Sequence, residues 1–328
     1  MHDLVAIGDI VTDAFIRLKD ARVNCDVNRE RCTITMPFGD KIPYESVEVV
    51  RAVGNCANAA VTASRLGLSS ALVSDLGDDQ NGKECLESLE NDKVDTIFMK
   101  THQGKETNYH YVLWYEDDRT ILVKHQEYNR TFPDIGGPKW LYLTSLGADT
   151  LEYHKFIIEY IKNYLNVSLA FQPGTFQIGL GFEILKEIYK HAEIFFCNVD
   201  EAERILDLST LGINELLKRI HALGPKIVVI TDGPKGAYAY DGEHFWLQPP
   251  YPDPKPPFER TGAGDAFSAS TVAALALGHD LPTALSWGAV NSMSVVQQVG
   301  AQKGLLTRPQ IEKYLKDAPA DFRTKPFK

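Results

Sequence analysis

The sequence predicts an α/β fold with a three-layer main domain and a small antiparallel β lid. Short β-branched runs alternate with longer helical patterns along most of the chain, which is typical of a parallel sheet wound by crossover helices. Two stretches, residues 11–52 and 104–126, break this rhythm, because polar and apolar residues alternate there without helices between them. Such alternation indicates a separate antiparallel sheet with one solvated face.

The expected strands of the main domain follow one another along the chain. They are apolar on both faces, as a sheet covered by helices on both sides requires. Helical patterns at 58–66 and 153–164 precede the second and third strands, and amphipathic patterns precede the last two. The expected strands are residues 4–7, 71–74, 168–171, 194–197 and 227–231.

The lid strands fall in the two alternating stretches, which flank one βαβ unit of the main domain. We therefore expect one lid that is inserted at two points. Its expected strands are residues 33–36, 46–50, 108–115 and 120–124. The domain boundaries that follow are 1–10, 53–103 and 127–328 for the main domain, with 11–52 and 104–126 for a discontinuous lid.

Composition and charge exclude several classes of protein. The 328 residues carry a formal net charge of −10, and no Lys/Arg cluster offers the basic face that nucleic-acid binding needs. No window approaches the roughly 18 apolar residues of a membrane span, and the N-terminus reads as a strand rather than a signal peptide. A dinucleotide-binding dehydrogenase needs G-x-G-x-x-G after its first strand, and Gly8 stands alone there.

The cysteines indicate the compartment. The five residues Cys25, Cys32, Cys56, Cys85 and Cys197 are scattered, without a C-x-x-C pair or other metal-ligand spacing. We expect free thiols in a reducing compartment, and therefore a cytoplasmic protein.

The segment 259–267, E-R-T-G-A-G-D-A-F, is the strongest candidate for chemistry and leads into a helix of small apolar residues. Gly262 and Gly264 let the backbone come close to a ligand. The free amides from Ala263 to Asp265 would point at an anion, and the positive helix end would hold the Asp265 carboxylate ionised. From the residues alone, Asp265 is either a first-turn helix aspartate or a general base beside a phosphate cradle.

Residues 261–267, T-G-A-G-D-A-F, resemble the C-terminal signature of the ribokinase-like (PfkB) carbohydrate kinases. The second family signature resembles A-V-G-N-C-A-N-A-A at 52–60, and further matches are G-D-D at 77–79, N-V-D-E at 198–201 and T-D-G-P-K-G at 231–236. The resemblance implies a Rossmann-like (ribokinase-like) main domain. It also implies an ATP-dependent sugar kinase that phosphorylates a hydroxyl of a small carbohydrate.

The resemblance further implies roles for single residues at the site of transfer. Asp265 would be the general base for the attacking hydroxyl, and the amides of Gly262, Ala263 and Gly264 would stabilise the transferred phosphoryl group. Mg²⁺ would be organised by the element that contains Asn198 and Glu201, with Glu201 acting through water; the same pair can also cap a helix. The nucleotide loop would contain Thr231, Gly233, Lys235 and Gly236, where Lys235 either contacts the phosphates or is a solvated loop lysine.

On the acceptor side, Asp13 aligns with the family's sugar-binding aspartate. Asn55 and Asn58 lie where the start of a helix presents polar groups to the substrate. A strand period of two puts His110 and Lys124 on one side of the lid. His110 is either a substrate contact or an exposed residue, and Lys124 stands where several related sugar-acid and fructose kinases carry arginine, so it would meet a carboxylate or phosphate.

The sequence also departs from the family pattern. Val53 replaces the first of two usual glycines at the lid hinge, and Glu259 with Arg260 replaces Asp-Thr in the C-terminal signature. Gly304 stands where a serine is usual in the monovalent-cation loop. The family's potassium requirement is therefore left open for this chain.

Two alternative functions remain open from the sequence: a nucleoside kinase of the same fold, and a catalytically silent sugar-sensing homologue. The intact residues Asp265, Gly262, Gly264, Asn198 and Glu201 argue against the silent homologue. A lid sheet with one exposed face favours pairing with a second lid, so a homodimer is expected, partly by family analogy.

Overall fold

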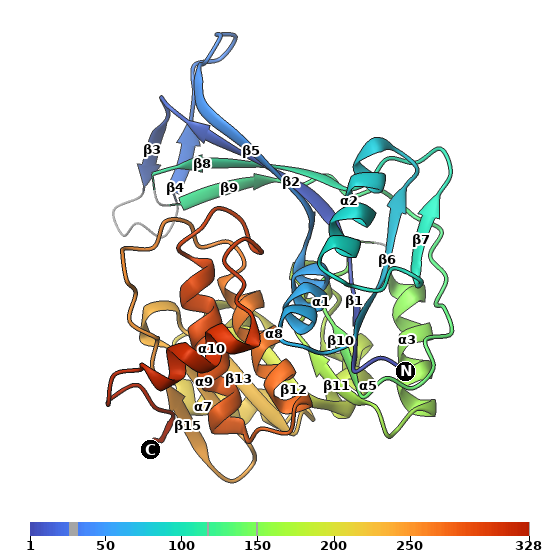
Figure 1. The fold of residues 1–328 in the computed structure, drawn as a ribbon, viewed down its shortest axis with the longest axis vertical. Coiled ribbons are helices and arrows are strands. Elements are labelled where there is room, and N and C mark those ends of the chain that lie inside the picture. The colour runs from blue at the N-terminus through green and yellow to red at the C-terminus, as the bar shows by residue number, and fades with distance from the viewer. Residues whose placement is uncertain (26–31, 117, 149, 328) are drawn as a thin grey trace.

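A ten-stranded sheet forms the centre of the molecule (Figure 1). The computed structural model describes residues 1–25, 32–116, 118–148 and 150–327. The strand order is β16-β15-β14-β13-β12-β11-β10-β1-β6-β7, in which the strands from β13 to β7 run parallel and the others join in antiparallel pairs. The strands are β1 (Leu4–Ile7), β6 (Ser70–Gly77), β7 (Met99–His102), β10 (Trp140–Leu143), β11 (Ser168–Phe171), β12 (Ala192–Asn198), β13 (Ile227–Thr231), β14 (Ala237–Tyr240), β15 (Phe245–Gln248) and β16 (Lys325–Pro326).

Helices cover both faces of this sheet, so the main domain has three layers. Leu4 and Ala6 of β1 face one buried core, and Val5 and Ile7 face the other, as the period of two requires. The first core packs against α1 (Asn55–Arg65), α2 (Gln80–Asn91), α8 (Ala263–Ala276), α9 (Leu281–Val295) and α10 (Arg308–Lys316). The second packs against α3 (Leu151–Asn163), α4 (Thr175–Leu180), α5 (Phe182–His191), α6 (Val199–Leu206) and α7 (Ile213–His221).

The predicted fold class is confirmed by these layers and by a second, smaller sheet. In the part of the chain that the structure describes, no helix combines the length and the hydrophobicity of a membrane span.

The small sheet lies above the carboxyl end of β1 and has the order β5-β2-β8-β9 (Figure 1). Its strands are β2 (Val11–Leu18), β5 (Tyr44–Val53), β8 (Tyr109–Tyr115) and β9 (Asp118–Leu122). The outer pairs are antiparallel, whereas β2 and β8 pair in parallel because both strands leave the main sheet in the same direction. We call this sheet the lid; the exact domain boundaries stay a prediction.

One face of the lid is turned toward the main domain. Phe15 of β2 with Val112 and Trp114 of β8 forms a small separate core with Val299, which follows α9. Asp13 lies two residues before Phe15, and its register partner is His110. Because side chains two residues apart share a face, both polar residues also lie on the inner face of the lid.

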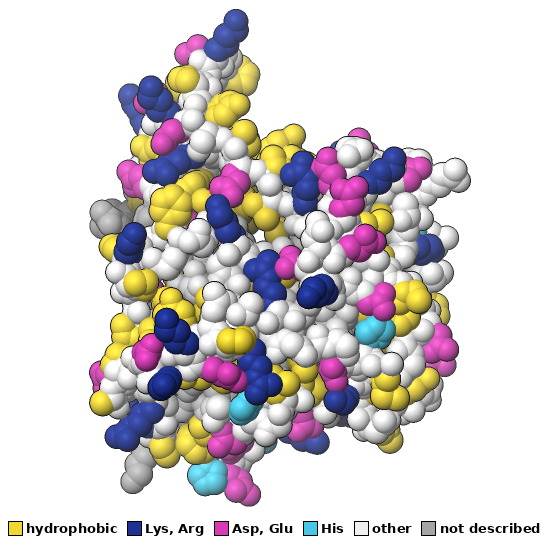
Figure 2. Space-filling model, viewed as in Figure 1, with side chains coloured by type: hydrophobic (Ala, Val, Ile, Leu, Met, Phe, Trp, Pro, Cys, Tyr) yellow, Lys and Arg dark blue, Asp and Glu magenta, His cyan; other side chains and the backbone are white. Residues whose placement is uncertain are grey.

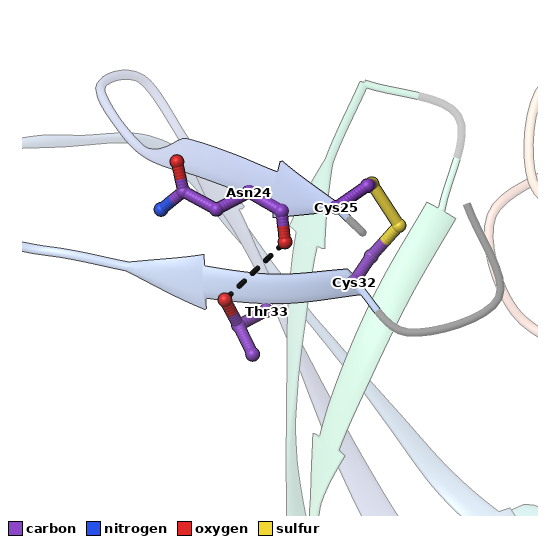
Figure 3. Close-up of a disulfide and its surroundings, with 4 residues drawn as sticks. All are labelled: Asn24, Cys25, Cys32 and Thr33. Atoms are coloured by element: carbon purple, nitrogen blue, oxygen red, sulfur yellow. Dashed lines mark hydrogen bonds between the residues drawn. A yellow bond between two sulfur atoms is a disulfide. The ribbon is translucent and has the colours of Figure 1, made fainter. Parts of the chain in front are cut away.

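The expectation of five free thiols is wrong for two cysteines. Cys25 ends β3 (Arg22–Cys25) and Cys32 begins β4 (Cys32–Thr35), and the two form a disulfide (Figure 3). Metal-ligand spacing does not reveal such a pair, whereas the antiparallel pairing of β3 with β4 places Cys25 opposite Cys32, seven residues away in the sequence. Cys56, Cys85 and Cys197 are free and buried.

The close packing of α8 against α9 fixes the position of the α8 N-terminus. A Cβ atom on Gly288 of α9 would lie 2.6 Å from the Thr271 hydroxyl and 2.7 Å from the Phe267 carbonyl oxygen of α8. Glycine therefore permits the backbones to approach, and any larger residue must push the helices apart.

We predict that Gly288→Ala lowers the free energy of unfolding by about 1–3 kcal/mol, because of this overpacking. The matched control is Gly179→Ala in α4, where an added Cβ meets no atom within 4 Å. Urea unfolding of both variants measures the difference. Equal stability of Gly288→Ala and wild type would contradict the tight packing of α8 on α9.

Candidate active site

Helix α8 begins at a glycine whose conformation and surroundings exclude other residues. Gly262 is the N-cap residue and has a φ of 78°. A Cβ at this position would lie 2.3 Å from the Cβ of Ala301. The left-handed turn directs the chain into the helix so that the first-turn amides face outward, and such amides with the helix dipole attract anions.

The carboxylate of Asp265, in the first turn of α8, is held by two amide side chains. Asn58 Nδ2 of α1 donates to one oxygen at 2.8 Å, and Gln172 Nε2 donates to the other at 3.0 Å. Asn58, predicted as a substrate contact, is almost fully buried with its amide directed at Asp265; a contact with the substrate stays a prediction.

A further layer of hydrogen bonds fixes the orientation of both amides. The Tyr142 hydroxyl donates to Gln172 Oε1 at 2.5 Å, so that the NH₂ group of Gln172 must point to the carboxylate. Gln302 Nε2 donates to Asn58 Oδ1 at 3.1 Å and to the Ala52 carbonyl at 2.7 Å, which orients Asn58 in the same way. These partners come from four separate segments of the chain.

Desolvation of Asp265 raises the pKa of its carboxyl group, and the hydrogen bonds from Asn58 and Gln172 oppose this shift without cancelling it. The net direction is upward, opposite to the effect expected from the helix end alone, because desolvation outweighs the stabilisation of the charge. A carboxylate with a raised pKa is the better proton acceptor, provided that it is ionised at the working pH.

A cavity of about 220 Å³ lies beside the first turn of α8. Thr231, Gly233 and Gly236 line it from the turn after β13, and Ala263 and Gly264 line it from α8. The proline-rich segment between β15 and α8 supplies a further wall of the cavity, through Pro249, Pro250, Tyr251, Asp253, Pro257 and Arg260. The structure thus brings the predicted nucleotide loop and the predicted phosphate cradle to one cavity.

Lys235 is not one of the residues that line this cavity. Its ammonium group donates to the Asp232 carboxylate at 3.1 Å, and its side chain is 73% exposed. Among the described residues that line the cavity, the guanidinium group of Arg260 is the cation at the approach to α8. The sequence marked Arg260 only as a departure from the family pattern.

Asn198 and Glu201 form a capping box at the start of α6. The Asn198 side-chain oxygen accepts from Glu201 N at 2.8 Å, and the Glu201 carboxylate accepts from Asn198 N at 2.9 Å. Desolvation raises the pKa of Glu201, the Asn198 amide opposes that shift, and the negative charge of Asp265 adds to it. The two carboxylates therefore lie within electrostatic reach, and oxygen donors of this kind suit Mg²⁺.

On the acceptor side, the structure brings Asp13 and His110 together. His110 Nδ1 lies 3.4 Å from Asp13 Oδ1, and both side chains are largely buried. Asn55 is the first residue of α1. Lys124 lies apart: its ammonium group donates to Glu106 at 2.6 Å, and its side chain is 63% exposed.

The sequence did not single out the ionic cluster behind Asp13 and His110. Asp9 follows β1, accepts from Gly147 N at 2.6 Å and from Arg130 at 2.6 Å, and lies 3.4 Å from His125 Nδ1. The signal that could have found Asp9 is its place at the carboxyl end of a parallel strand, where ligands bind in open α/β sheets. His125 and Arg130 lie on a segment without regular structure, and no pattern marks them.

The departure at Glu259 also has a structural explanation. Its buried carboxylate accepts from the Thr261 amide at 2.8 Å and from the Thr261 hydroxyl at 2.5 Å. Arg119 of the lid strand β9 lies 3.6 Å from the same carboxylate. A lid residue thus places a positive charge next to the turn that leads into α8.

Solved structures of small-molecule kinases superpose on this chain. The nucleoside kinase of Methanocaldococcus jannaschii superposes with a TM-score of 0.76 at 21% identity and covers 96% of this chain and 98% of its own. The ribokinase of Arabidopsis thaliana, solved in complex with ribose and ATP, superposes with a TM-score of 0.78 at 21% identity, covering 96% and 99%. These likenesses establish the ribokinase fold.

The chain belongs to the pfkB family of carbohydrate kinases, whose family model matches residues 1–308. By sequence, it is 27% identical to the ribokinase of Bacillus subtilis over 267 residues, which is 80% of this chain and 87% of that protein. It is 26% identical to the nucleoside kinase of Methanocaldococcus jannaschii over 259 residues, or 79% and 83%. The resemblance drawn from the sequence is confirmed, and with it the class of enzyme, a kinase of carbohydrate or nucleoside hydroxyls.

We predict that Gln172→Leu moves the acidic limb of the pH–rate profile to higher pH. The substitution removes one hydrogen bond that lowers the Asp265 pKa, so the carboxyl group loses its ionised form at a higher pH. Turnover should fall most on the acidic side and approach wild type as the pH rises. The exposed Gln298→Leu serves as control, and an unchanged acidic limb in Gln172→Leu would show that Asp265 does not set it.

Proposed function

We propose that this protein transfers the γ-phosphate of ATP to a hydroxyl of a small carbohydrate, with Asp265 as the general base and Mg²⁺ at the phosphates. The single observation that carries the proposal is the environment of Asp265. Asp265 directly follows Gly264, a residue that lines the cavity. The side-chain amides of Asn58 and Gln172 hold its carboxylate in place. In this proposal the carboxylate acts between the nucleotide in the cavity and the acceptor at the inner face of the lid.

Different residues of the chain have different roles in the phosphoryl transfer. Asp265 accepts the proton of the acceptor hydroxyl as that oxygen approaches the γ-phosphorus. The amides of Gly262, Ala263 and Gly264 bind the non-bridging oxygens, where charge develops during phosphoryl transfer. Asn58 and Gln172 keep the carboxylate in one orientation, so little rearrangement is needed when the proton moves.

The nucleotide occupies the cavity beside Thr231, Gly233 and Gly236 in this proposal, and Arg260 binds its phosphates in place of the Lys235 contact expected from the sequence. The ATP in the Arabidopsis ribokinase, and the ATP with Mg²⁺ in a 17%-identical structure from Escherichia coli, support ATP and Mg²⁺ as the ligands. Mg²⁺ held near Glu201 neutralises phosphate charge when it is bound. Asn198 keeps Glu201 in place through the capping box.

A nucleoside acceptor is the second candidate, because two archaeal nucleoside kinases are 26% and 27% identical to this chain. Ribosides and sugars present the same kind of hydroxyl to Asp265, so the proposed mechanism holds for both. The network around Asp265 argues against a catalytically silent sensor, because binding alone does not need an enclosed carboxylate with two oriented donors.

We predict that Asp265→Asn removes most turnover while ATP still binds. An amide cannot accept the hydroxyl proton, and loss of a general base costs about 10²–10⁴ in rate, or about 3–5 kcal/mol of barrier. The fall should lie in kcat more than in KM, because the lost interaction belongs to the transition state.

The control for this experiment is Asp317→Asn, at the exposed C-terminal end of α10. Calorimetry with ATP shows that the fold and the nucleotide cavity of each variant are intact. If Asp265→Asn keeps more than about a tenth of wild-type turnover when chemistry is rate-limiting, Asp265 is not the base.

We also propose that two copies of the chain pair through the outer face of the lid. The strand register aligns Val49, Ala14, Tyr111 and Leu122 in one row across the four strands, on the face opposite Asp13. Val49, Tyr111 and Leu122 are 36%, 49% and 51% exposed. Figure 2 shows apolar side chains among charged ones over the lid. Exposed apolar side chains in one row favour an interaction surface.

The cytoplasmic location expected from the sequence stays a prediction.

We predict that wild type elutes as a dimer of the 36.6 kDa chain and that Leu122→Lys shifts it toward the monomer. The charge would be buried in the paired face, which is costly without a partner. The control is Ile97→Lys, at a residue that is 73% exposed just before β7. Light scattering after size exclusion measures the mass. A monomeric wild type, or a Leu122→Lys variant that remains dimeric, would contradict lid pairing.

A further inference from the structure

A chain of buried ions lies behind the acceptor side of the site. Arg130, whose side chain is 9% exposed, donates to Asp9 at 2.6 Å and to Asp75 at 3.1 Å. Asp75 in turn lies 2.6 Å from His102 Nε2. Two carboxylates therefore hold the one guanidinium group, and its positive charge is fully engaged.

Asp9 stays ionised within this chain. Burial by itself raises its pKa, but the neighbouring His125 imidazole and the positive charge of Arg130 outweigh burial, and the net shift is downward. The negative charge of Asp9 is therefore a permanent feature of the acceptor side near neutral pH.

Three side-chain atoms in front of this ion chain are buried without a hydrogen bond. Among the described residues, these are Asp13 Oδ1, His110 Nε2 and His125 Nδ1; Asp13 Oδ1 has His110 Nδ1 3.4 Å away, without the geometry of a hydrogen bond. The ring centroids of His110 and His125 are 5.2 Å apart, and those of His125 and Phe176 are 5.9 Å apart. A buried polar atom that the protein leaves unpaired is costly, so these atoms point to a ligand that pairs with them.

The chemistry of these atoms discriminates between ligand groups. A carboxylate such as Asp13 is an acceptor only, so its unpaired oxygen requires a donor. A sugar hydroxyl donates one hydrogen bond and also accepts, so it can satisfy Asp13 and His110 at once. An ionised carboxylate or phosphate of a ligand offers only acceptor oxygens. These would face the acceptor oxygens of Asp9, Asp13 and Asp265 without a hydrogen to share.

The basic residue expected to receive an anionic acceptor is engaged elsewhere. Lys124 forms its ion pair with Glu106 at 2.6 Å and is largely exposed. Arg130 is held by Asp9 and Asp75, as described above. Arg130 cannot be released to an anionic substrate without leaving a buried carboxylate unpaired. The exposed Glu106 holds Lys124 only weakly, since it also accepts from Gln126 at 3.1 Å.

From this arrangement we infer that the acceptor is an uncharged polyhydroxyl compound, a neutral sugar, polyol or riboside, and that the site excludes sugar acids and sugar phosphates. This inference rests on the proposed kinase function and narrows it. It differs from what the sequence suggested for Lys124, and it assigns Asp9, Asp13, His110 and His125 to acceptor recognition, with Asp75 and Arg130 as positioning residues behind them.

The test compares matched neutral and charged ligands with the wild-type protein. Fructose is paired with fructose 1-phosphate and fructose 6-phosphate, so that one chain end stays free in each, and glucitol is paired with gluconate. Calorimetric binding with the non-hydrolysable ATP analogue present measures recognition, and ADP release with ATP measures turnover. Each neutral ligand should bind at least about tenfold more tightly than its charged counterpart, a difference of about 1.4 kcal/mol in the free energy of binding.

The two readouts keep this inference apart from the kinase proposal. A charged member that binds as well as its neutral counterpart overturns the inference, even if it is phosphorylated. Failure of the whole panel to bind at millimolar concentration overturns it as well. Binding of neutral members without ADP release supports the inference and counts against the kinase proposal.

A substitution behind the site tests the charge argument directly. Asp75→Asn removes one of the two charges that engage Arg130, so the preference for neutral over charged ligands should fall several-fold. The matched control, Glu90→Gln on the exposed side of α2, removes one negative charge from the surface and should leave the preference unchanged. An unchanged preference in a folded Asp75→Asn protein would overturn the assigned role of the ion chain.

Discussion

The proposed role of Asp265 as a general base requires a carboxylate that is desolvated enough to accept a proton readily and yet held firmly in one place, and much of the structure bears on this requirement. Asn58 from α1 and Gln172 after β11 supply the two donors. Tyr142 of β10 and Gln302 after α9 orient them. The central sheet, the lid-proximal helix α1 and the C-terminal helices are therefore tied together at one side chain, and the raised pKa of Asp265 follows from the enclosure that they create.

The lid completes the site from the other side. Its inner face carries Asp13 and His110 beside the apolar contact of Phe15, Val112 and Trp114 with Val299. The apolar contact sets the position of the strands, and the polar pair then faces the ion chain around Asp9. Arg119 extends the lid toward Glu259 and the turn before Gly262. The position of the lid is thus linked to the geometry of the α8 N-terminus through the contact of Arg119 with Glu259 and the hydrogen bonds of Glu259 with Thr261.

The sequence predicted those features that depend on local pattern. Strands β1, β11 and β13 lie at the expected residues, and the glycine-rich start of α8 with Asp265 was found because conformation and spacing are readable there. Short strands such as β10 and β14, the parallel pairing of β2 with β8, and the Cys25–Cys32 disulfide depend on which distant segments meet. The same reason hid Gln172 and Arg130, and the sequence could not show that Asn58 meets Asp265 or that Lys124 meets Glu106, since a side chain takes its partners from distant parts of the chain.

The central claim is that Asp265 directs the γ-phosphate of ATP to an acceptor hydroxyl. The most direct measurement is ³¹P NMR of the wild-type protein with Mg-ATP and a mixture of neutral sugars, polyols and ribosides. The account predicts a new phosphomonoester signal that grows in step with ADP, while free phosphate stays at the background level. ATP that remains intact across the mixture, or ADP formed only together with free phosphate, would contradict it.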